Sequence, residues 1–193
     1  PCASRGAARP DPAAGFRRRA GTLRAVVDPV SVSVTISRPR EEVFAYLVDV
    51  ANHSEFTDHY LVDWHLTREN SVGRGAGARF RIKSAANPFQ RFAWADATFV
   101  DVQEPRRIVE QGRAGKYNRI RTMGIYELEQ GPHGTTRVTF TNQTQPATLT
   151  DRINESLGQR GWLKRKNAKA LRRLRAILEH GDKRGERVTV AGG

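Results

Sequence analysis

The sequence predicts an α+β fold in which a curved antiparallel sheet of about seven strands wraps around a long C-terminal helix, with two short helices after the first strand. Residues 150–180 place apolar side chains on one face of a helix, and that face needs a covering surface. The stripe consists of Ile153, Leu163, Ala170, Leu171, Leu174, Ile177 and Leu178. The segments before it have a period of two, and their turns are too short for parallel crossovers. We therefore expect an antiparallel sheet to cover the helix.

The first ordered elements follow from local patterns. Residues 30–36 alternate apolar and polar side chains, which is typical of a half-buried strand. Ser37 and Pro39 then precede Val43, Phe44 and Leu47, so we expect a helix over about 39–48. Residues 52–60 predict a second short helix anchored by an aromatic side chain.

The remaining strands are separated by turn residues such as those at 104–105, 112–115 and 131–134. We expect strands from residue 61 and around 79–83, then over 92–102, 106–111, 119–129 and 135–144. Alternation predicts an outer face bearing Arg79, Arg81, Arg119, Arg121, Glu127 and Glu129. The same alternation predicts an inner face bearing Trp64, Phe80, Ile82, Ile120, Tyr126, Leu128, Val138 and Phe140. A cavity between this face and the helix is the expected place for a ligand.

Length and charge predict one domain over 29–181, with a disordered basic extension over 1–28 and a flexible tail over 182–193. The net charge is +13, but segments 1–28 and 152–187 carry almost all of it, so the sheet region is close to neutral. The single Cys2 excludes an intramolecular disulfide and a cysteine-based metal cluster, which favours a reducing, cytoplasmic location. An organelle transit leader is a minor alternative. No apolar run approaches the roughly 20 residues that span a bilayer.

Three motifs carry a resemblance to a known superfamily. They are SVTISRPREEVFAYLVD at 33–49, VGRGAGARF at 72–80 and VQEPRRI at 102–108. Together they resemble the START-like helix-grip superfamily, also called SRPBCC, which includes polyketide cyclases/dehydrases and lipid-transfer proteins. The resemblance covers about residues 30–180 and implies a helix-grip fold with a ligand cavity. Its members share that cavity and not a catalytic set, and Phe56 stands where many of them have Trp.

The candidate ligand-binding residues are mostly aromatic. They are Phe56, Tyr60, Trp64, Phe80, Trp94, Tyr126, Phe140, Asn142 and Trp162. Their rings suit a flat or apolar ligand, and the polar groups of Tyr60, Tyr126 and Asn142 would orient it. The alternative, that the aromatic residues simply fill the core, carries about equal weight.

A metal or catalytic site has weaker support. The spacing of His53, His59 and His65 does not bring their side chains onto one face, so we expect no metal site. If the protein is an enzyme, His59 with Asp58 is the candidate general base for an enolisable substrate. The glycines at 73–77 lack the Lys-Ser/Thr of a phosphate loop and are expected to connect strands.

The sequence therefore favours binding or transport of a small hydrophobic ligand, lipid-like or aromatic polyketide-like, without a cofactor. One alternative is a cofactor-free cyclase or dehydratase on the same scaffold. Another is a basic accessory factor in which the C-terminal helix binds RNA, the ribosome or an anionic membrane. Nucleic acid and membrane are not favoured as partners, because no aromatic side chains interleave with the helix charges. The oligomeric state is not indicated.

Overall fold

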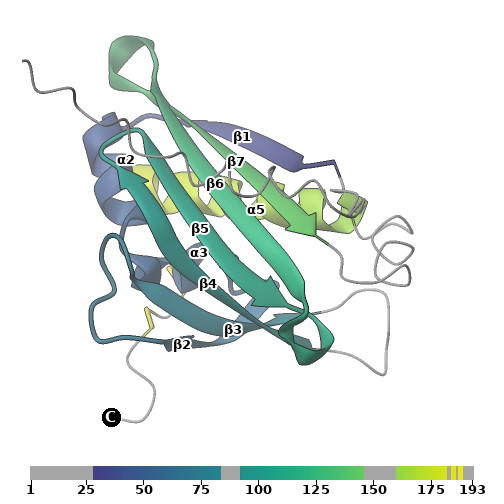
Figure 1. Cartoon of the computed structure of the whole chain (residues 1–193). Coiled ribbons are helices and arrows are strands. Elements are labelled where there is room, and N and C mark those ends of the chain that lie inside the picture. The colour runs from purple at the N-terminus through teal and green to yellow at the C-terminus, as the bar shows by residue number, and fades with distance from the viewer. Residues whose placement is uncertain (1–27, 84–91, 146–159, 182–183, 186, 189–193) are drawn as a thin grey trace, which may run out of the picture.

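The computed structural model describes residues 28–83, 92–145, 160–181, 184, 185, 187 and 188, and it confirms the predicted helix-grip fold. A seven-stranded antiparallel sheet curves around the helices in the order β1-β7-β6-β5-β4-β3-β2 (Figure 1). The strands are β1 (Val30–Ile36), β2 (Leu61–Leu66), β3 (Gly77–Lys83), β4 (Phe92–Gln103), β5 (Arg107–Ala114), β6 (Ile120–Gln130) and β7 (Thr136–Gln145).

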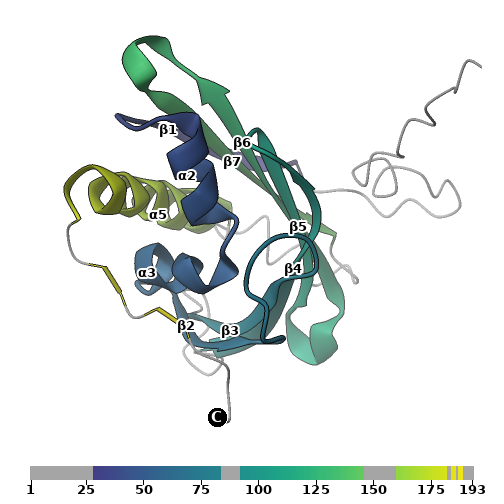
Figure 2. The ribbon, with the colours of Figure 1, turned by 90° about the vertical axis from the view of Figure 1, so that its left-hand side faces the viewer.

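The helices occupy the concave side of this sheet (Figure 2). They are α2 (Arg40–Leu47), the 3₁₀ turn η1 (Val50–Asn52), α3 (His53–Thr57) and the long α5 (Arg160–His180), while the short 3₁₀ turns η2 (Lys116–Asn118) and η3 (Pro132–Gly134) join strands. Helix α2 begins after Pro39 and buries Val43, Phe44 and Leu47. The predicted start of the last helix, at 150–159, and the predicted extension, at 1–27, lie outside the described residues.

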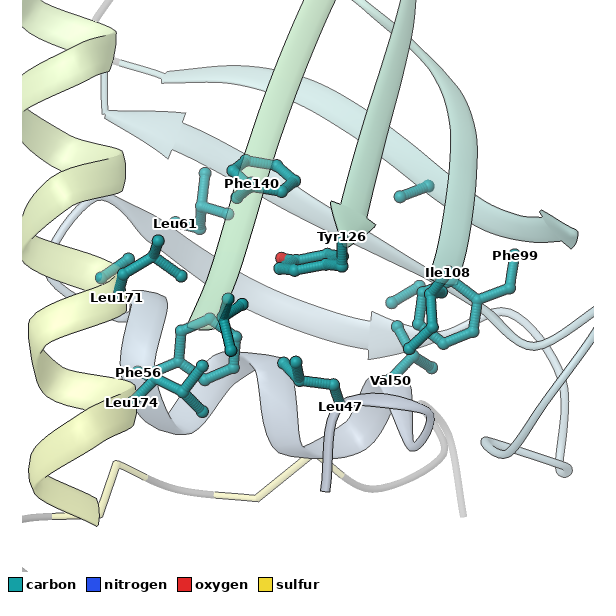
Figure 3. Close-up of a cluster of buried hydrophobic side chains, with 14 of the residues drawn as sticks. Leu47, Val50, Phe56, Leu61, Phe99, Ile108, Tyr126, Phe140, Leu171 and Leu174 are labelled. Carbon is teal, nitrogen blue, oxygen red and sulfur yellow. The ribbon is translucent and has the colours of Figure 1, made fainter. Parts of the chain in front are cut away.

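Helix α5 packs against β1 and α3 through the apolar stripe that the sequence predicts. Ala170, Leu171, Leu174 and Ile177 are all at most 4% exposed. They meet the inner face of the sheet in one continuous core (Figure 3). Each Å² of this apolar stripe that is removed from water contributes about 25 cal/mol. This burial holds α5 to the sheet although the rest of the helix is charged.

Strand register aligns the inner side chains into rows that cross the sheet. The buried row contains Val32, Phe140, Tyr126 and Ile108, each directly opposite the next, and none is more than 9% exposed. Two residues further along the strands lies the polar row, which contains Asn142, Gly124 and Glu110. The next is the threonine row, which contains Thr144, Thr122 and Gly112. Because side chains alternate between faces, all three rows lie on the concave face.

The rows differ in accessibility. Glu110 and Asn142 in the polar row, and all three residues of the threonine row, are partly accessible, whereas the buried row is closed. The side chains are also small here, since two of these six positions are Gly and two are Thr. The concave face is therefore tightly filled near α2 and less filled toward the ends of β5 and β7.

The described residues near the C-terminus lie against η1 and α3. The backbone N–H of Gly185 donates to the carbonyl of Glu55 at 3.1 Å, and that of Val188 donates to the carbonyl of Ala51 at 3.3 Å. Arg187 donates to the carboxylate of Asp49 at 2.6 Å. The sequence predicts a flexible tail over 182–193, and it gives no sign of these contacts.

Candidate functional site

Glu110 is the acidic side chain of the polar row. It lies opposite Gly124, and a Cβ on that glycine would overlap the Glu110 side chain, so the glycine leaves room for the carboxyl group. Burial raises the pKa of Glu110 to about 7. The described part of the chain provides no hydrogen bond or ion pair to this carboxyl group. Glu110 is thus surrounded by protein atoms, yet part of its surface remains accessible.

Two tyrosines face the same region. Burial, and to a smaller extent the negative charge of Glu110, raise the pKa values of Tyr60 and Tyr126 above their usual range. Both hydroxyl groups therefore stay protonated at any physiological pH. The hydroxyl of Tyr60 donates to Oδ1 of Asn167 at 3.0 Å, which joins the end of α3 to α5.

Asn167 is the polar residue on the inner stripe of α5. It is 2% exposed, and Nδ2 has no partner among the described residues. The Nε1 atom of Trp64 is also buried without a partner there. A buried donor without an acceptor is costly, so such groups call for an explanation. The polar centre, defined here as Glu110, Tyr60, Tyr126 and Asn167, thus has unused hydrogen-bonding capacity inside an apolar surrounding.

Aromatic side chains form the surrounding walls. The rings of Tyr126 and Phe140 stack at 4.4 Å, and those of Trp64 and Phe80 lie 4.5 Å apart. Trp162 makes an edge contact with Tyr60 at 6.1 Å. Figure 3 shows Tyr126 and Phe140 extending from the sheet toward α5, with Phe56 below them. Apart from Asn142, all predicted ligand-binding residues but one lie in or against this core cluster, namely Phe56, Tyr60, Trp64, Phe80, Tyr126, Phe140 and Trp162.

Asn142 joins them from the polar row, but Trp94 lies on the other side of the sheet. Trp94 is 38% exposed, and the guanidinium groups of Arg79 and Arg81 lie 4.8 and 5.5 Å from its ring centre. Its neighbour Ala95 faces the core instead. Strand alternation thus puts Trp94 on the outer face, where cation–π contacts cover it, so it cannot line the concave site.

The predicted acid/base pair is not hydrogen-bonded in the described structure. Asp58 accepts from both terminal nitrogens of Arg173, at 2.5 and 3.0 Å, and so ties α3 to α5. His59 donates from Nε2 to the carbonyl of Lys166 at 3.2 Å. Burial lowers the pKa of His59 to about 4, so its ring is neutral. Each side chain therefore contacts α5 rather than the other.

The remaining candidate groups have structural partners. His53 is buried, its Nε2 donates to the carbonyl of Leu47 at 2.8 Å, and burial lowers its pKa to about 4. Among the described residues no group of three His, Cys, Asp or Glu side chains is arranged to hold a metal. Within the same residues no helix has the length and apolarity needed to cross a membrane.

The outer face of α5 is basic, as the sequence predicts. Its exposed cations are Lys164, Arg165, Lys169, Arg172 and Arg175. Arg175 lies 4.0 Å from Glu179, the next acidic side chain along the helix. These charges point away from the concave site.

Sequence reasoning missed Glu110 and Asn167. Asn167 could have been found, since it lies four residues before Leu171 on the apolar stripe, where a polar residue is unexpected. Glu110 gave no comparable signal, because Ile108 and Val109 are both apolar and hide which face of the strand is the inner one.

Comparison with known proteins identifies the family. The family described as polyketide cyclase/dehydrase and lipid transport matches residues 29–179. No curated protein matches the sequence significantly. Similar solved structures include KanY (TM-score 0.61, 15% identity, 79% of this chain and 97% of that chain) and a conserved protein from Geobacillus kaustophilus (TM-score 0.60, 14% identity, 81% and 97%).

A third similar structure is DynU16, a protein of the dynemicin biosynthetic locus (TM-score 0.56, 17% identity, 81% of this chain and 49% of that chain). At these identities the structural likeness shows the fold alone. The match to the family itself extends over most of the chain and includes every strand and nearly all of α5. The chain therefore belongs to the polyketide cyclase/dehydrase and lipid transport family.

Proposed function

We propose that the protein binds a small hydrophobic ligand, lipid-like or aromatic polyketide-like, between the concave face of the sheet and α5. The observation that carries this proposal is the difference between the inner rows. The buried row is closed, whereas Glu110, Asn142 and Thr122 remain partly accessible although they lie on the same inner face. Small side chains in a region surrounded by aromatic rings leave space that an apolar ligand would fill.

The composition of this region supports ligand binding over simple core filling. A core needs no ionisable group, because burying a carboxyl without a partner costs free energy. Glu110 and the unpartnered Nδ2 of Asn167 thus have no evident structural purpose in the described chain. Apolar burial would supply affinity, since removing about 300 Å² of apolar surface from water at about 25 cal/mol per Å² gives roughly 7.5 kcal/mol before the costs of association.

Filling the space tests the proposal. We would compare Thr122→Phe, in the threonine row, with Thr139→Phe, which makes the same change on the outward-facing side of β7. Binding of the neutral dye N-phenyl-1-naphthylamine would be measured by fluorescence, and native mass spectrometry would detect apolar molecules that co-purify from the natural host. We expect Thr122→Phe to weaken dye binding at least tenfold and to abolish co-purification, while Thr139→Phe leaves both unchanged. Equal binding by the two variants would contradict the proposed location.

A cofactor-free cyclase or dehydratase is the second candidate function, and the pKa of Glu110 favours it. A carboxyl group that titrates near pH 7 can both accept and donate a proton at neutral pH, as general acid/base catalysis requires. In this reading Glu110 takes the role that the sequence suggested for His59. Turnover of an enolisable substrate that falls at least a hundredfold in Glu110→Gln but persists in His59→Ala would support it.

A further inference from the structure

The polar centre also bears on which head group a ligand carries, an inference that rests on the proposed function. We propose that the site is selective for charge: it accepts an apolar ligand whose head group is a neutral carbonyl or hydroxyl oxygen, and it rejects the corresponding carboxylate. The geometric basis is the carboxyl group of Glu110 and the hydroxyl of Tyr126 on the sheet, together with the hydroxyl of Tyr60 after α3 and the unpartnered amide donor of Asn167 on α5. Among the described residues no cation lies beside this group.

The arginine side chains of strands β3, β5, β6 and β7 face away from Glu110. Arg107 and Arg113 lie an odd number of residues from Glu110 on β5, so they emerge on the opposite face. By the same alternation Arg121 and Arg137 face outward from β6 and β7, and both are exposed. On β3, Arg79 and Arg81 lie beside the outward-facing Trp94. Strand β1 has no charged residue.

The described helices have basic side chains that are paired, exposed or partly exposed. On α5, Arg173 binds Asp58, and Lys166 is half-buried with its Nζ 5.7 Å from the Trp162 ring centre. The other basic residues of α5 are exposed or partly exposed. On the short helices, Arg40 contacts Glu41, and Glu55 accepts from the hydroxyl of Tyr46 at 2.8 Å. His53 and His59 are neutral at pH 7 because burial lowers the pKa of each to about 4.

The described residues thus offer an incoming anion no positive charge beside Glu110. A ligand carboxylate would have to leave water and approach a group that is itself negative in part of the molecules at pH 7, so both desolvation and repulsion oppose binding. A single neutral oxygen meets no charge repulsion, and its desolvation costs much less than that of a carboxylate.

The hydrogen-bonding groups favour a neutral oxygen directly. Nδ2 of Asn167 is a donor in need of an acceptor, and Oδ1 of the same side chain is already held by Tyr60. A ligand carbonyl or hydroxyl oxygen can accept from Nδ2, and Glu110 can donate when protonated or accept when ionised. This pairing satisfies the buried donor that has no partner among the described residues.

A matched pair of ligands tests the proposal: tridecan-2-one and tridecanoate compete for the site against N-phenyl-1-naphthylamine at pH 8. In the unmodified protein we expect the ketone to displace the dye at a concentration at least tenfold lower than the acid. In Glu110→Gln, which keeps the shape and removes the charge, the acid should improve at least tenfold while the ketone changes less than threefold. The outward-facing Glu127→Gln should behave like the unmodified protein.

The outcomes separate this proposal from the proposed function. If the unmodified protein fails to bind the dye, the proposed function itself fails. If it binds the dye but the ketone and the acid compete equally, or if Glu110→Gln leaves the preference unchanged, only the charge selectivity is overturned. As a second probe, Asn167→Leu should weaken the ketone at least threefold more than it weakens the dye, which has no oxygen atom to accept a hydrogen bond from Nδ2. Equal ketone affinity in that variant would contradict the role of Nδ2.

Discussion

The buried row and the polar row are neighbours on the same strands, yet they differ in accessibility. Phe140 and Asn142 lie two residues apart on β7 and point to the same side. Phe140 is stacked on Tyr126 in the closed core, whereas Asn142 is partly accessible beside Gly124 and Glu110. The comparison shows that the same face of one sheet can be closed at one row and partly accessible at the next, only two residues further along the strands.

The sharpest test of this comparison truncates one side chain in each row. Phe140→Ala should lower the free energy of unfolding by about 3–5 kcal/mol, because it removes a buried ring and leaves a cavity. Asn142→Ala should cost less than about 1 kcal/mol, as expected for a partly accessible residue. Urea denaturation would measure both. Similar losses in the two variants would mean that the rows are not distinct.

Filling the space beside Glu110 in the polar row should have the next largest effect on stability. Gly124→Ala adds a methyl group where the Glu110 side chain lies, so the carboxyl group must move. We expect a loss of about 1–3 kcal/mol in stability, which is the usual cost of overpacking. Dye binding should fall as well, because the displaced carboxyl group takes up space in the polar row. Unchanged stability and binding would show that Glu110 can move away freely.

The polar row contains an ionisable group, Glu110, so we expect the free energy of unfolding to depend on pH through this residue. Folding raises the pKa of Glu110 from 4.5 to about 7. The contribution of Glu110 to the free energy of unfolding is therefore fully present below about pH 4.5 and is lost as the pH rises toward 7. Glu110→Gln should therefore gain stability relative to the unmodified protein between pH 4.5 and 8, by at most about 3 kcal/mol. Denaturation curves of both proteins at several pH values would show it. A constant difference would mean that Glu110 is not buried.

The smallest expected effect compares the two faces of the sheet. Trp94→Phe changes a residue covered by arginines on the outer face, so dye binding should change less than twofold and stability by about 1 kcal/mol or less. Trp64→Phe removes the buried Nε1, which has no partner among the described residues, from the inner face. It should alter both the affinity for the dye and the tryptophan fluorescence of the protein with dye bound. Fluorescence titration of the two variants would check this, and an equal response would place both tryptophans at the site.

Most of the fold was predictable because period-two and helical patterns are long and regular here. The strand alternation around Phe80 and Tyr126, and the stripe on α5, gave the correct faces. The site was harder to predict. Val109, Met123 and Ile125 form a small apolar cluster on the outer face, so β5 is apolar on both sides and its sequence does not reveal that Glu110 points inward. The prediction that Trp94 lines the ligand site was wrong for a different reason. Its aromatic ring suggested an inward position, but a ring covered by arginine side chains is also stable on the outer face.

The contacts of Gly185, Arg187 and Val188 with η1 and α3 have a practical consequence for anyone who prepares this protein. A shortened version that ends at His180 would expose the carbonyls of Ala51 and Glu55 and remove the ion pair between Arg187 and Asp49. An affinity tag or fluorescent fusion placed directly after α5 would do the same next to η1 and α3. Versions that retain the chain through Val188 are therefore the sound starting material for all the assays described above.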